Sequence, residues 1–165
     1  MEATAPALRK NMEQRLEDAI GSALRRVAHM DVRRVAIEDQ KRHIGRMTSC
    51  QMTIQGSGFL GSLIMMIPGE AGPGLVARVV TEKDEDRPKG PELAEAIGTV
   101  GAAIALAFAK SFTDEERLIV GMPTVITGSD IAVAFPWGRD FESRQCFVSG
   151  DSPFWVILRL SRLAA

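Results

Sequence analysis

The chain has 165 residues, 45% of them hydrophobic, and its 20 basic and 21 acidic residues leave a formal net charge of −1. This length suits one packed domain over residues 1–165, and the near balance of charge gives no support for binding nucleic acid. The amphipathic N-terminal stretch lacks the short apolar core of a signal peptide, so we expect a cytoplasmic protein.

The first part of the chain predicts a long helix followed by strands. Apolar residues recur every three or four positions between Leu8 and Val27, which is typical of a helix with one apolar face, and we place this helix at 6–29. Strands are predicted at 32–37 and at 48–55, where apolar and polar residues alternate.

The hexamer GSGFLG, from Gly56 to Gly61, has the spacing of a dinucleotide-binding loop. Such a loop needs a helix of about ten residues or more after its last glycine, with amide groups facing a pyrophosphate. The run that follows, SLIMMIP, is short, apolar and ended by a Pro-Gly pair, as expected of a buried strand. We therefore favour a β-hairpin turn that joins 49–55 to 61–67 over a nucleotide site.

The second half of the chain predicts two more helices and several strands. A short helix is expected at 74–82, and a longer one at 91–110 with proline in its first turn. Together with about six strands, these helices indicate an α+β fold, a mainly antiparallel sheet with the N-terminal helix and a central small-residue helix packed on it. The later strands are expected at 117–123, 124–128, 130–138, 145–150 and 153–161.

The helix at 91–110 has a middle of small and aliphatic residues. Gly98, Ala102 and Ala105 are expected on one face, where another element can approach closely. The apolar part is shorter than the ~20 residues that a membrane span needs. We therefore interpret it as a buried helix that crosses a sheet.

Three polar residues, Glu92, Glu95 and Thr99, share one face of the first two turns of this helix. A solvated helix end accounts for them, and so does a ridge that touches a partner. We predict that they are more exposed than the apolar residues of the other face, Ile97, Val100 and Ile104.

No metal site or cofactor is expected. Cys50 and Cys146 are too few and too far apart for a disulfide framework or a Cys-x-x-Cys site, so buried reduced thiols are the simpler interpretation. His29 and His43 have no partner at the spacing of metal ligands.

The segment EAIGTVGAAIALAFAK, at 95–110, is similar to the central helix of the CheX-like and CheC-like chemotaxis phosphatases. QGSGFLGSLIMMI resembles the glycine-turn hairpin of that family, MPTVITG the segment after its helix, and CFVSGDSPFWVILRL its closing strands. The resemblance covers nearly the whole chain and implies a CheX-like fold. It also implies a partner, the receiver domain of a CheY-like response regulator, whose phosphoaspartate the family hydrolyses.

The chain departs from this family at two positions of the central helix. The family carries Glu and, three residues later, Asn; the Asn amide positions the attacking water and the Glu pairs with a lysine of the receiver. Those positions are Thr99 and Ala102 here. Alanine has no group that orients water, and loss of such a group typically costs at least ~100-fold in rate.

We therefore favour a CheX-like protein that binds a receiver through Glu92, Glu95 and Thr99, with phosphatase activity lost or weakened. One alternative is an active phosphatase that uses Thr99, Glu95 or a residue of the acidic loop at 80–87. Another is a small-molecule sensor in which the central helix forms one wall of a pocket.

The last segment, SPFWVILRLSRLAA, is too apolar for a free sheet edge unless something covers it. The family resemblance implies a homodimer, which could pair edge strands or bury this surface. The alternative is that the N-terminal helix covers the segment within one monomer.

Overall fold

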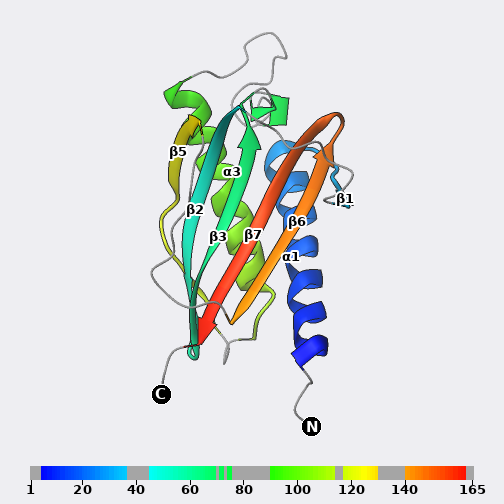
Figure 1. Cartoon of the computed structure of the whole chain (residues 1–165), viewed down its shortest axis with the longest axis vertical. Helices are drawn as coiled ribbons and strands as arrows, with labels where there is room; N and C mark the ends of the chain where they lie inside the picture. Colours follow the sequence, from blue (N-terminus) through cyan, green and yellow to red (C-terminus); the bar gives the residue numbers. More distant parts are fainter. Residues whose placement is uncertain are drawn as a thin grey trace.

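The computed structural model describes residues 5–36, 45–69, 71–72, 74–75, 90–113, 117–129 and 140–162. Two helices and seven strands lie in these ranges (Figure 1). The helices are α1 (Ala5–Ala28) and α3 (Pro91–Lys110). The strands are β1 (Arg33–Val35), β2 (Arg46–Gln55), β3 (Phe59–Pro68), β4 (Ile119–Val120), β5 (Thr124–Ser129), β6 (Phe141–Ser149) and β7 (Ser152–Arg162).

The strands form one antiparallel sheet in the order β1-β6-β7-β3-β2-β4, and β5 also pairs with β2. β4 and β5 share one edge of β2, where β5 pairs with 46–51 and β4 with 54–55. The predicted α+β class and antiparallel sheet are confirmed.

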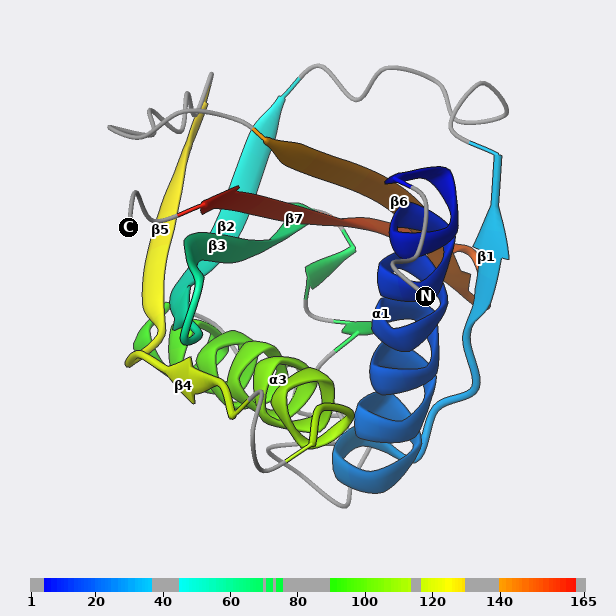
Figure 2. The same ribbon diagram turned by 90° about the horizontal axis from the view of Figure 1, so that it is seen from below.

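Both helices pack on the same face of the sheet and against each other (Figure 2). Leu16, Ile20 and Leu24 of α1 are fully buried, which confirms the apolar face that the spacing predicted. On the strands, side chains at alternate positions point toward the helices. The fully buried side chains of this sheet face include Cys50, Met52, Ile54, Leu63, Met65, Ile67, Phe154, Val156 and Leu158.

The α3 helix belongs to this core. Among the described residues it is the one helix with the length and apolar composition of a membrane span, but half of its apolar stretch is buried in the fold. It lies close to the sheet at Gly101, where a Cβ atom would lie 2.5 Å from Cys50 Sγ. The sequence interpretation placed Ala102 on the packed face, and this is wrong, because Ala102 is only half-buried and Gly101 takes that role.

The GSGFLG hexamer forms the predicted hairpin turn. β2 and β3 pair from Met47 with Pro68 to Gln55 with Leu60, and the Gly56 amide donates a 2.9 Å hydrogen bond to the Phe59 carbonyl. After this turn the chain continues as strand β3, as SLIMMIP predicted, and no helix begins at the last glycine.

Several predicted strands have other bounds in the structure. The segment 117–123 contributes only β4, since Gly121 and Pro123 interrupt regular pairing in this region. β6 begins at Phe141, earlier than predicted, because it includes charged residues on the sheet face away from the helices. The predicted strand at 130–138 lies outside the described residues, as does most of the predicted helix at 74–82.

The apolar C-terminal segment is not a free edge. β7 pairs with β3 on one side and with β6 on the other. The side chains of Phe154, Val156 and Leu158 are fully buried in the core that contains α1. Coverage within one chain therefore accounts for the apolar strand, and the homodimer stays a prediction.

Glu142 of β6 links two arginines on the face of the sheet away from the helices. Its carboxylate oxygens lie 2.6 Å from Arg144 Nε and 2.6 Å from Arg159 Nε, and the Arg159 side chain is only 11% exposed. Burial alone would raise the pKa of Glu142, but the hydrogen bonds and positive charges of the two arginines outweigh it, so this pKa is lowered from 4.5.

Replacing Glu142 by Gln is expected to lower the free energy of unfolding by about 2 kcal/mol at neutral pH, because the mostly buried Arg159 loses a charge-assisted hydrogen bond of 2.6 Å. Because the pKa of Glu142 is lowered in the folded state, its contribution to stability is complete above pH 4.5 and is lost as the pH falls through the pKa of the folded state. The Gln variant should not show this acid-dependent loss of stability. Urea unfolding across the acidic range measures both effects. The control is Arg144→Gln, whose side chain is 53% exposed and whose loss should matter little. Equal effects of the two variants would contradict the prediction.

Candidate functional site: the exposed face of α3

The α3 helix presents one line of residues away from the core. Glu92, Glu95 and Thr99 are exposed, Leu106 is 50% exposed, and Ala102 between them is half-buried. The opposite side is buried, with Ile97, Val100 and Ile104 at 0% exposure. The predicted difference in exposure between the two faces is therefore confirmed. We call these five residues the α3 surface.

The start of α3 explains the two acids. The helix begins at Pro91 after Gly90, which has a φ of 56° and offers no side-chain cap. The amide groups of the first turn have no side-chain acceptor from Gly90, and they give the N-terminal end of the helix a partial positive charge. Glu92 complements that charge, and Glu95 follows on the same side.

Thr99 and Ala102 occupy the middle of the α3 surface. Thr99 Oγ1 donates a 3.0 Å hydrogen bond to the Glu95 carbonyl of its own helix. The hydroxyl proton is used in this bond, so the Thr99 oxygen can only accept a hydrogen bond from a partner. Ala102 contributes a methyl group, so the described residues in this part of the surface offer no amide or carboxylate that could orient a water molecule.

Apolar side chains flank this middle part. β4 lies alongside α3 (Figure 2), and a Cβ atom on Gly98 would lie 3.8 Å from Pro123 Cγ. Ile119 is 64% exposed and Met122, which precedes Pro123, is 87% exposed. Ile119 pairs with the exposed Gln55 and so lies on the sheet face away from the helices, whereas its neighbour Val120 pairs with the buried Ile54. We call Leu106 and Met122 the apolar flank.

Sequence reasoning found the acidic half of the α3 surface and missed the apolar flank. The spacing that joins Glu92, Glu95 and Thr99 continues to Leu106, so the exposure of that leucine could have been inferred from helical periodicity. Met122 gave no such signal, because it lies in a segment that was predicted as one regular strand.

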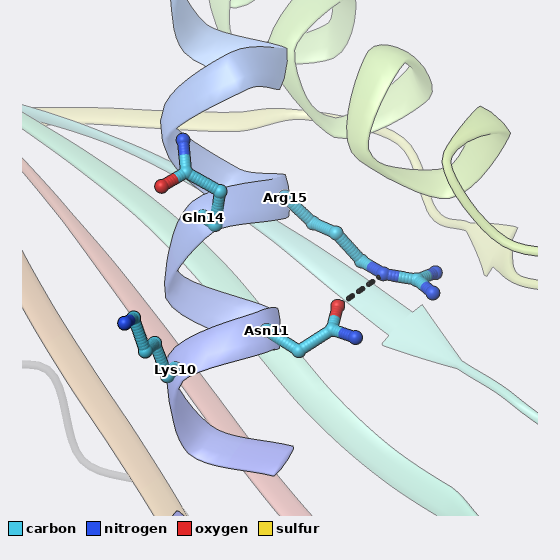
Figure 3. A pocket seen from close by; sticks show the side chains of 4 residues that line it. All are labelled: Lys10, Asn11, Gln14 and Arg15. Atoms are coloured by element: carbon cyan, nitrogen blue, oxygen red, sulfur yellow. Dashed lines mark hydrogen bonds between the residues drawn. The ribbon is translucent and has the colours of Figure 1, made fainter. Parts of the chain in front are cut away.

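A cavity of about 380 Å³ lies on α1, away from the α3 surface, and its described lining residues are Lys10, Asn11, Gln14 and Arg15 (Figure 3). Arg15 Nε donates to Asn11 Oδ1 at 2.7 Å, and Arg15 Nη1 donates to the Ser111 carbonyl at 2.7 Å. The same guanidinium lies 4.7 Å from the centre of the Phe112 ring. These contacts connect α1 to the end of α3 and give Arg15 a structural role.

The cysteines are free and buried, as predicted. Burial raises the pKa of the Cys50 thiol to about 11 and also raises that of Cys146, so both thiols stay protonated at neutral pH. Within the described ranges, no group of three or more His, Cys, Asp or Glu side chains could hold a metal ion. The acidic loop at 80–87, which was one candidate source of a catalytic group, lies outside the described residues.

No protein-family model and no curated protein matches the sequence. Solved structures do match. CheX from Vibrio vulnificus is 12% identical with a TM-score of 0.72, over 92% of this chain and 99% of that chain. A CheC-like superfamily protein from Shewanella sp. PV-4 is 14% identical with a TM-score of 0.73, over 91% and 97% of the two chains.

A third match is a complex of CheX with CheY, BeF3 and Mg²⁺ from Borrelia burgdorferi, which is 19% identical with a TM-score of 0.69. It covers 89% of this chain and 96% of that chain. These matches cover about nine tenths of this chain at low sequence identity. The chain therefore has the fold of the CheX-like and CheC-like chemotaxis proteins.

Proposed function

We propose that this protein is a cytoplasmic signalling protein of a chemotaxis or two-component pathway that binds a CheY-like receiver domain through Glu92, Glu95 and Thr99. Residues 1–165 would act as one CheX-like domain, and the protein would form a homodimer. Its phosphatase activity is lost or strongly weakened. The exposed line of residues on α3 carries this proposal, in a fold that is shared with a CheX protein crystallised with CheY.

The acidic end of the α3 surface suits a cationic group of the partner. Glu92 and Glu95 are both exposed on one side of the helix start. A receiver domain carries a lysine in its active site, and an exposed carboxylate pair can bind such an ammonium group. The carboxylates provide orientation and specificity, whereas the apolar flank can provide area that becomes buried.

The middle of the α3 surface explains why activity should be weak. Hydrolysis of an aspartyl phosphate needs a water molecule held in line with the phosphorus atom. Ala102 has no group for this task, and the Thr99 proton is engaged by the Glu95 carbonyl. Binding of the receiver and hydrolysis of its phosphate are therefore separable in this protein.

Reversing the charge of Glu95 tests the proposed interface. Glu95→Lys is expected to weaken binding of a phosphorylated receiver by tenfold or more, about 1.4 kcal/mol, because it places two positive groups together. Titration calorimetry with the CheY-like receivers of the same genome measures this. Asp18→Lys is the matched control, an equally drastic charge change at an exposed residue of α1. Unchanged affinity in Glu95→Lys, or equal losses in both variants, would contradict the interface.

A further inference from the structure

The apolar flank lies near the position on α3 where a phosphatase would hold its water. Along α3, Ala102 lies between the acidic end at Glu95 and the exposed Leu106, which are separated by about 16 Å of helix. Met122 adds an exposed apolar side chain next to Pro123, whose ring lies close to Gly98 of the helix. A partner that contacts Glu95 and Leu106 together must therefore also cover Ala102.

This arrangement has a chemical consequence for an acyl phosphate. In its hydrolysis a water oxygen forms a bond to phosphorus while the bond from phosphorus to the aspartate oxygen breaks, which releases inorganic phosphate and a carboxylate. The water must reach the face of phosphorus opposite the leaving oxygen. A methyl group at 102 with apolar neighbours excludes water from this position and supplies nothing that positions it.

We propose that docking of the α3 surface shields the phosphoaspartate of a receiver from water and prolongs its phosphorylated state. This inference rests on the proposed function. It adds the effect of binding on the receiver, which would keep its phosphate for longer when bound than when free. The occupant is a phosphorylated receiver domain. Its active-site lysine complements Glu92 and Glu95, and the surface around its phosphorylated aspartate lies against Ala102 and the apolar flank.

The test follows the decay of phosphoaspartate. The cognate receiver is phosphorylated with a small-molecule phosphodonor, the donor is removed, and loss of phosphate is measured with and without saturating full-length protein. The half-life is expected to lengthen several-fold when the receiver is bound. The double variant Leu106→Gln with Met122→Gln, also at saturation, should bring the half-life back toward that of the free receiver.

The control is Ile126→Gln, since Ile126 is 48% exposed on β5 outside the apolar flank, and it should keep the full protection. Calorimetry on the same samples separates the outcomes. If the receiver does not bind, the proposed function itself is wrong. If the receiver binds and its half-life is unchanged, the shielding is wrong while the proposed binding stands. Faster decay would show phosphatase activity and would overturn the shielding.

Discussion

Changing Thr99 to Glu together with Ala102 to Asn is expected to raise receiver dephosphorylation about 100-fold or more above that of the unmodified protein. The Asn amide oxygen can accept a hydrogen bond from the attacking water, and the Glu can pair with the receiver lysine. Both positions can take longer side chains toward solvent, since Thr99 is exposed and Ala102 is only partly buried on the same side of α3. Phosphate release from a phosphorylated receiver gives the rate directly.

Ala109→Asn provides the matched control. Ala109 lies two turns beyond Ala102 on α3 and is also only partly buried, so the substitution has the same intrinsic effect on the helix. It should leave dephosphorylation unchanged. A double variant that binds the receiver without faster decay would mean that the water is not held at position 102 in this protein.

Gly61→Ala is expected to lower the free energy of unfolding by about 3 kcal/mol or more. Gly61 lies in β3 directly against β7, and a Cβ atom there would collide with the Arg159 carbonyl oxygen and lie 2.7 Å from Leu160 Cδ2. The carbonyl belongs to the backbone of a central strand and cannot turn away like a flexible side chain. The β3–β7 pairing must therefore shift to accept even one methyl group.

Urea unfolding measures this loss, and Gly58→Ala is the control from the same hexamer. A Cβ atom on Gly58 would meet no other group within 4 Å. Its substitution should change the free energy of unfolding by less than about 1 kcal/mol. Similar stability in both variants would show that the close approach of the two strands relaxes at little cost.

Periodicity along the chain was sufficient for the main elements. The three- to four-residue spacing of apolar side chains defined α1, and a short apolar run ended by Pro-Gly showed that GSGFLG is a hairpin turn. The same reasoning separated the buried and exposed faces of α3, including the exposure of Glu92, Glu95 and Thr99. These features depend on local geometry, in which burial repeats with the period of the helix or strand.

Contacts between distant segments decided the rest. The sequence showed that α3 is rich in small residues, but only the packing of its large apolar side chains set its rotation, which places Gly101 against Cys50 and leaves Ala102 at the surface. The order of the strands likewise brings β4 and the segment that follows it beside α3, where Met122 is exposed. Helical and strand periods specify which face of an element is buried, whereas its neighbour depends on how all the elements pack together, and that only the tertiary structure determines.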